Sequence, residues 1–227
     1  MKYSDFECIM SAARMSRYRA SCRGESKTAM TLYRKNLNLS QELFTIISCF
    51  EVAFRNAIDK HFVTQLGQDW LRDAALTGGI FDNKQRLIAK NMIYDKVRGL
   101  TNKYSHEKLI AEMGFGFWRY LFSQPQFQAG GQTLLQIFPG KPKSNRNIQY
   151  NHTFVFNSLA NVVELPNRIA HHEPVCFVLG QPIKNSTYAR QNYGLILQLF
   201  QWLGIDEAAL LYGLDDVNTI CNEIDKL

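Results

Sequence analysis

The 227-residue sequence lacks a long apolar segment, and its first residues do not resemble a signal peptide. Its longest apolar run, from Leu43 to Phe50, is far shorter than the ~20 residues that a membrane-spanning helix needs. Cysteine is sparse, odd in number and scattered, which argues against a disulfide framework and indicates reduced thiols. The five are Cys8, Cys22, Cys49, Cys176 and Cys221. We therefore expect a soluble cytoplasmic protein with no membrane partner.

Metal-binding patterns are also missing. Neither Cys-x-x-Cys nor His-Glu-x-x-His occurs, and the whole chain has five histidines, so we expect neither a metal nor another cofactor.

Charge is moderately positive: 26 Lys and Arg against 20 Asp and Glu give +6 and a pI near 9.1. Such a balance favours phosphate backbones. Two basic clusters, Arg14, Arg17, Arg19 and Arg23, and Lys141, Lys143 and Arg146, are interpreted as solvated surface, the first more firmly than the second.

The apolar spacing predicts an all-α protein. With 46% hydrophobic residues the chain can bury one substantial core, and we expect a single domain over residues 1–227. Caps and helical periodicity predict the following helices: Ser4 to Tyr18, Glu25 to Asn36, Asn38 to Leu66, Asp82 to Arg98, Ser105 to Phe122, Asn145 to Glu164, a short helix restarting at Pro166, Ser186 to Leu203, and a terminal pair from Asp206 and Asp215.

Charged residues lie beside the apolar stripe of the long helix predicted from Asn38. Glu51, Arg55 and Asp59 are spaced four apart, with Asn56 next to them. A ladder of surface ion pairs, about 0.3–0.5 kcal/mol each, is one interpretation; a functional role for Glu51 and Arg55 is the other. The match of Arg55 and His61 to Arg-x5-His is interpreted as chance.

The densest group of candidate functional residues lies between Leu165 and Pro174. It contains Asn167, Arg168, Glu173 and two adjacent histidines, His171 and His172. Pro166 suits the first turn of a helix, on which Ile169 and Ala170 would face inward while Arg168 and His172 share a face. Neighbouring histidines are more often solvated or hydrogen-bonded than catalytic, and adjacent helix positions point ~100° apart, a poor geometry for a shared metal.

This segment resembles the Leu-Arg-Asn-Arg-Ile-Ala-His-His-Glu-Pro signature of Abi-like (abortive infection) proteins, a branch of the HEPN superfamily of helical ribonucleases. Supporting motifs occur in the family's order. They are Leu32-Tyr33-Arg34-x-Asn36-x-x-Leu39-Ser40, Phe50-Glu51-Val52-Ala53-Phe54-Arg55-Asn56-Ala57-Ile58, Gly67-x-x-Trp70 and Gly114-Phe115-Gly116-Phe117-Trp118. The resemblance extends roughly from Ser11 to Gly204.

The resemblance implies a HEPN-like helical bundle with additional helices and a metal-independent endoribonuclease of a phage-defence, abortive-infection or toxin system. It implies RNA as substrate, a 2′,3′-cyclic phosphate product, and a homodimer in which two motif helices form one cleft. An antitoxin or a phage-derived trigger would be a further partner. His171 would be the motif histidine, His172 and Glu173 would orient it or bind phosphate, and Asn167 would contact substrate or brace the turn.

One position departs from the family pattern, because Pro166 stands where the motif arginine is expected. Three explanations remain open: the chain is a degenerate family member, the arginine was lost because an active toxin harms the cell that makes it, or another arginine, Arg55 or Arg168, supplies the charge. Two residues along a helix rotate a side chain by roughly 200°, so Arg168 cannot simply adopt the same geometry. The alternative function is a non-catalytic HEPN-type scaffold that binds RNA or protein.

Overall fold

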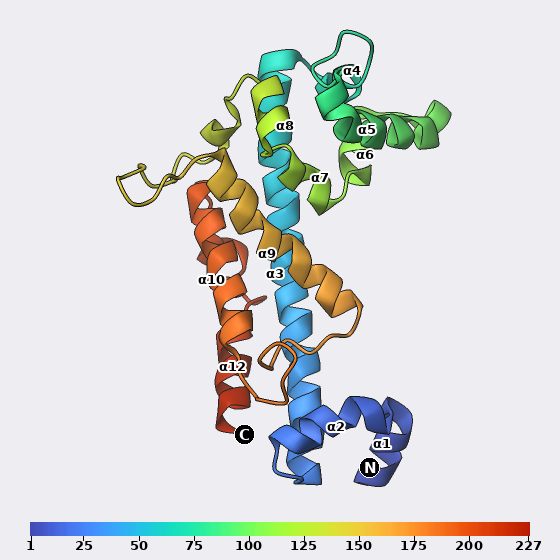
Figure 1. Cartoon of the computed structure of the whole chain (residues 1–227), viewed down its shortest axis with the longest axis vertical. Coiled ribbons are helices and arrows are strands. Elements are labelled where there is room, and N and C mark those ends of the chain that lie inside the picture. Colours follow the sequence, from blue (N-terminus) through green and yellow to red (C-terminus); the bar gives the residue numbers. More distant parts are fainter. The chain divides into compact units, whose positions relative to one another are not determined.

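The computed structural model describes all 227 residues and is all-α (Figure 1). The α-helices are α1 (Tyr3–Met10), α2 (Ala12–Ser21), α3 (Ser26–Leu66), α4 (Trp70–Ala74), α5 (Leu87–Leu100), α6 (His106–Glu112), α7 (Phe115–Tyr120), α8 (Gln124–Ala129), α9 (His152–Ala170), α10 (Thr187–Trp202), α11 (Glu207–Leu210) and α12 (Val217–Lys226). Short 3₁₀ helices cover Lys84–Arg86, Thr101–Lys103 and Leu134–Ile137. One isolated antiparallel bridge joins Phe177 and Lys184. None of the helices combines the length and apolarity that crossing a bilayer requires.

Helix α3 is longer than the sequence pattern predicts. Two helices meeting near Leu37 and Asn38 are expected, but a single 41-residue helix runs through both positions. Asn38 is exposed in the middle of it and caps nothing. The buried positions explain the continuity, because the three- and four-residue spacing from Leu32 through Asn36 to Leu39 has no interruption.

Helix α9 also corrects a prediction. The sequence analysis has a helix ending at Glu164 and another restarting at Pro166, whereas α9 passes through Pro166 without a break. A proline removes one intrahelical hydrogen bond, but its fixed φ is compatible with the helix. Leu165 is fully buried, whereas Ala170, predicted to face inward, is exposed.

Two other predicted helices are each divided in the structure. Ser11, with φ 74°, separates α1 from α2, and the Met113 to Gly114 step separates α6 from α7. The short helices α4 and α8 were not predicted. Helix α10 and the terminal helix α12 agree with prediction to within about two residues.

The chain divides into two compact units. Unit 1 comprises Met1–Ser48, Glu164–Gln198 and Glu207–Leu227, and unit 2 comprises Cys49–Val163 and Leu199–Asp206. The sequence analysis expects one domain; the boundary between the units falls within α3, α9 and α10.

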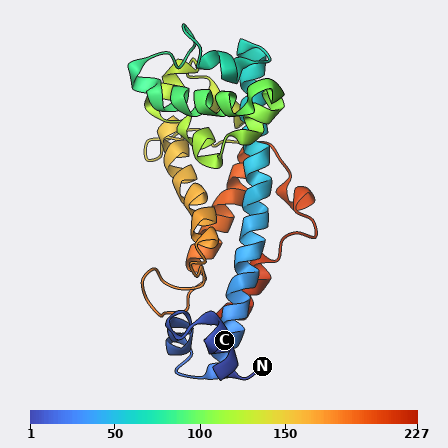
Figure 2. The same cartoon turned by 90° about the vertical axis from the view of Figure 1, so that its right-hand side faces the viewer.

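The core of unit 1 joins its N-terminal helices through aromatic rings. Phe6 of α1 and Tyr18 of α2 both pack edge-to-face on Tyr33 of α3, with ring centroids 5.5 and 5.1 Å apart. Tyr18 also packs on Phe177, at 5.0 Å. Figures 1 and 2 show α1 and α2 beside the first turns of α3.

The core of unit 2 is a second aromatic cluster. Phe54 of α3 stacks on Phe122 and Phe138, and Phe50 packs edge-to-face on Phe115 and Phe200.

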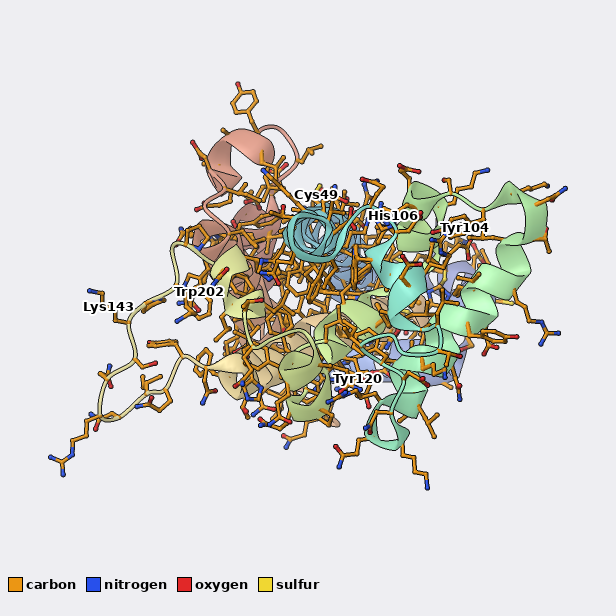
Figure 3. All side chains as sticks on the ribbon, turned by 90° about the horizontal axis from the view of Figure 1, so that it is seen from above. Cys49, Tyr104, His106, Tyr120, Lys143 and Trp202 are labelled. Carbon is orange, nitrogen blue, oxygen red and sulfur yellow. The ribbon has the colours of Figure 1, made fainter.

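The second basic cluster belongs to this unit: Lys143 lies on the loop before α9, well away from His106 and Tyr104 (Figure 3).

Candidate functional site

The candidate site begins where α9 ends, in unit 1. The amide of His172 donates to the carbonyl of Ile169, and that of Glu173 donates to the carbonyl of Arg168, both at 2.9 Å. His172 itself has φ 57°. These two bonds around a left-handed residue form a Schellman turn, in which this position is usually glycine. His172 therefore lies just beyond the helix, rather than on one face with Arg168 as predicted.

Helix α2 is attached to this turn and to the loop that follows it. Arg14 donates from Nη1 to the carbonyl of His172 at 3.0 Å. Arg17 donates from Nε and Nη2 to the carbonyl of Gln181, at 2.9 and 2.7 Å, and from Nη2 to that of Val178 at 2.8 Å. The interpretation as solvated surface is incomplete for Arg14, which is exposed but also bound to the motif turn, and wrong for Arg17, which is half-buried and holds the backbone of the segment after the motif.

A surface hollow of about 410 Å³ lies between α2 and the end of α9. Both histidines of the motif and both arginines of α2 contribute to it, and both imidazoles are exposed. The hollow is thus rich in groups that can move a proton or hold an anion. Its lining consists of Ser11, Ala13, Arg14, Arg17, Tyr18, His171, His172, Glu173 and Pro174.

Two lining residues have strained backbones. Ser11 has φ 74° and ψ 142°, a region populated almost entirely by glycine, and His172 has φ 57°. Five non-glycine residues of the chain have positive φ, and two of these line this hollow. Such conformations cost on the order of 1–3 kcal/mol each and cluster at functional sites, so the backbone supports a functional role for the hollow.

Tyr18 contributes an unpartnered hydroxyl to the lining. The residue is only 3% exposed, its ring is held by Tyr33 and Phe177, and the hydroxyl makes no hydrogen bond within the chain. Burial raises the pKa of Tyr18, although the charges of Arg14 and Arg17 oppose the rise. The hydroxyl therefore remains protonated at neutral pH and is available as a donor.

Arg168 lies outside the hollow and is bound on two sides. Its Nε donates to Glu173 at 3.0 Å, and its guanidinium lies over the Tyr188 ring, 4.4 Å from the centroid. Its side chain is 12% exposed. Burial alone would lower the pKa of Arg168, but its interactions with Tyr188 and Glu173 raise it. This geometry suits an arginine that fixes Glu173 at the edge of the hollow.

The other two motif residues do not line the hollow. Asn167 is exposed, and its carbonyl accepts the amide of His171 at 2.9 Å. Pro166 is half-buried within α9. Of the residues predicted in this segment, His171, His172 and Glu173 therefore line the hollow, and Pro166, Asn167 and Arg168 do not.

The remaining candidates lie on α3 in unit 2. Burial raises the pKa of the Glu51 carboxyl, against the lowering effects of Arg55 and of the Phe115 backbone amide. Arg55 has a buried Nε without a hydrogen-bond partner, and Asn56 is exposed. A shared site of these residues with His171 stays a prediction.

Residues that the sequence analysis missed are Ser11, Arg14, Arg17 and Tyr18. The only signal in the sequence is the three- and four-residue spacing of Arg14, Arg17 and Tyr18, which places them on one side of a helix. Nothing in that spacing shows that this side meets residues about 150 positions later in the chain. The contact is tertiary and could not have been predicted from local patterns.

Comparisons with protein-family models, with curated proteins and with solved structures found no match to this chain. The likeness to Abi-like proteins therefore stays a prediction based on the quoted motifs. The function proposed below is argued from the geometry of the hollow.

Proposed function

We propose that the chain is a metal-independent endoribonuclease of a phage-defence, abortive-infection or toxin system, with its site in the hollow between α2 and the end of α9. The observation that carries this proposal is the placement of two exposed, adjacent imidazoles, His171 and His172, in a hollow edged by arginine. The resemblance to HEPN ribonucleases adds the substrate class.

The chemistry needs a base, an acid and a cation. Histidine is the side-chain type that can accept or donate a proton at cellular pH. One imidazole would take the proton of an RNA 2′-hydroxyl as its oxygen attacks the adjacent phosphorus. The P–O5′ bond breaks, the leaving 5′-oxygen takes a proton from an imidazolium, and a 2′,3′-cyclic phosphate remains. Arginine stabilises the negative charge that develops on the phosphoryl oxygens.

We assign His171 and His172 to the proton transfers. Glu173, fixed by Arg168, would orient an imidazole or help to exclude a wrong tautomer, and Asn167 would contact the substrate beside His171. A homodimer with a composite cleft, in which each protomer contributes its α9 end, is part of the proposal, as is control by an antitoxin or a phage-derived trigger.

A second candidate function is a non-catalytic scaffold that binds RNA or protein. Pro166 favours it, because this position lacks the arginine that the resemblance implies for a nuclease. Such a scaffold would retain affinity for RNA without turnover.

Cleavage of total cellular RNA in the presence of EDTA tests the proposal. Four purified forms are compared: the unsubstituted chain, His171→Ala, Pro166→Arg, and Pro166→Arg combined with His171→Ala. Cleavage by the unsubstituted chain that is lost in His171→Ala supports an active nuclease. Cleavage by the Pro166→Arg form alone shows a nuclease inactivated at position 166.

Two other results contradict the proposal. If no form cuts RNA but the unsubstituted chain binds it, the scaffold is the better account. If cleavage persists in the His171→Ala variants, the site is elsewhere or the activity is a contaminant. A 2′,3′-cyclic phosphate end on the product, detected by its resistance to phosphatase until acid treatment, checks the chemistry independently.

A further inference from the structure

We infer that Arg14 and Tyr18 of α2 form the phosphate-binding half of the site, so that Arg14 supplies from another helix the positive charge that the motif lacks at Pro166. This inference rests on the proposed function for its substrate, an RNA phosphodiester. It assigns to that site a cationic residue that lies more than 150 positions from Pro166 in the sequence.

The bonding of Arg14 leaves it free to take a ligand. One guanidinium nitrogen, Nη1, donates to the His172 carbonyl at 3.0 Å, and neither Nε nor Nη2 makes a hydrogen bond or an ion pair within the chain. The side chain is exposed and lines the hollow beside both imidazoles. A guanidinium with two unused nitrogens matches a phosphate oxygen pair.

Arg17 has a different role, although it lines the same hollow. Its Nε and Nη2 are used by the carbonyls of Val178 and Gln181, and its guanidinium lies over the Phe177 ring, 4.7 Å from the centroid. Arg17 is thus a brace for the segment after the motif. Of the two arginines of α2 that line the hollow, Arg14 is the more exposed and has two unused nitrogens, so we assign anion binding to Arg14.

Tyr18 gives a second, independent indication of a ligand. It is nine-tenths buried, its ring is fixed, and its hydroxyl has no partner in the chain although it belongs to a residue that lines the hollow. Among the buried side-chain atoms that lack a partner the Tyr18 oxygen is not found, so the small exposed part of this residue includes the hydroxyl, which is accessible from the hollow. A phosphate oxygen held by Arg14 would accept this hydrogen bond, since the charges of both arginines act on the hydroxyl.

Arg168 does not compete for this role. Its guanidinium is engaged by Glu173 and by the face of Tyr188, and it does not line the hollow. Among the arginines beside the two imidazoles, Arg14 is therefore the one whose guanidinium is least engaged by the chain.

Binding of a non-cleavable RNA tests the inference apart from catalysis. The probe is a fluorescein-labelled oligonucleotide with 2′-O-methyl riboses, which cannot form the cyclic phosphate, and the readout is fluorescence anisotropy. Two variants remove the proposed contacts: Arg14→Gln, which keeps a donor for the His172 carbonyl but loses the charge, and Tyr18→Phe, which keeps the ring packing. Arg19→Ala is the matched control, since Arg19 is exposed on the same helix and does not line the hollow.

We expect Arg14→Gln to weaken binding at least tenfold and Tyr18→Phe to weaken it about threefold to tenfold. Arg19→Ala should change it less than twofold. The slope of log K against log salt should fall by ~0.7 in Arg14→Gln, the value for one phosphate contact on a single strand. Thermal melting without RNA should be unchanged in Arg14→Gln and unchanged or slightly raised in Tyr18→Phe, which separates a binding role from a structural one.

The outcomes distinguish this inference from the proposed function. RNA binding that depends on Arg14 and Tyr18, with no cleavage by any form, supports the phosphate site and refutes the nuclease. Cleavage that depends on His171 but is as fast in Arg14→Gln as in Arg19→Ala refutes the phosphate site and leaves the nuclease standing. Failure of the unsubstituted chain to bind the probe at all overturns the inference.

Discussion

Replacing His172 by glycine should make the protein more stable while abolishing the proposed activity. His172 has φ 57° at the end of α9, where an L-residue other than glycine costs roughly 1–2 kcal/mol. Histidine tolerates this region better than most residues, so the lower end of that range applies. Glycine loses about 0.5–1 kcal/mol through its greater freedom in the unfolded chain, which leaves a net gain between zero and about 0.5 kcal/mol.

The neighbouring histidine provides the control. His171 is also exposed, but its φ is negative, so glycine there brings no relief of strain. His171→Gly should lower the free energy of unfolding by about 0.5 kcal/mol, as glycine generally does in helical positions. The two variants, which have the same composition, should therefore differ by up to about 1 kcal/mol, equivalent to at most roughly 2–4 °C in Tm for a chain of this size.

Urea denaturation followed by circular dichroism measures this difference directly. The reasoning is refuted if His172→Gly is no more stable than His171→Gly at equal slope of the transition. If the stability order is as expected and both variants lose RNA cleavage, then a strained histidine is retained at a cost to stability, as functional sites often require.

Three further predictions use other parts of the molecule. Arg17→Ala should lower the free energy of unfolding by about 2 kcal/mol, because hydrogen bonds from a charged group to the carbonyls of Val178 and Gln181 are lost; urea denaturation checks this, and a loss as small as in Arg19→Ala would contradict the brace. Glu51→Gln should gain stability relative to the unsubstituted chain as pH rises from about 4 to 7. Burial raises the pKa of the Glu51 carboxyl in the folded state, so this carboxyl stabilises the fold below its unfolded pKa and loses that contribution as pH rises through the folded pKa, whereas glutamine does not titrate. A difference in the free energy of unfolding that stays constant across this pH range would refute the prediction. Native iodoacetamide labelling at pH 8, read by mass spectrometry, should modify exposed Cys8 and spare Cys176, whose pKa burial raises to about 12; equal labelling would show that Cys176 is accessible.

The all-α class was predictable from the sequence because apolar spacing at three and four residues records which face of each helix is buried. Breaks between helices were less predictable. Asn38 has the composition of a cap, yet α3 continues through it, because the buried stripe from Leu32 to Leu39 is uninterrupted. Conversely, Ser11 ends a helix that a pattern of caps and apolar residues would continue.

Pro166 shows how packing can outweigh a local signal. A proline in a helical pattern normally indicates a boundary, and the sequence alone places one there. In the structure α9 continues through Pro166, and Leu165 beside it is fully buried. The turn comes six residues later, at His172, where histidine occupies the left-handed position usually held by glycine and Pro174 follows two residues on.

Only the part of the candidate site whose residues are neighbours in the sequence could be predicted. His171, His172 and Glu173 are neighbours in sequence, so their density alone drew attention to them, whereas Arg14 reaches them from α2 through a hydrogen bond that spans 158 positions. Composition could report an excess of positive charge but not which arginine faces the imidazoles. If phosphate chemistry requires an arginine near the imidazoles rather than at one helix position, a guanidinium from α2 meets that requirement equally well, and a proline at position 166 does not by itself argue against the proposed function.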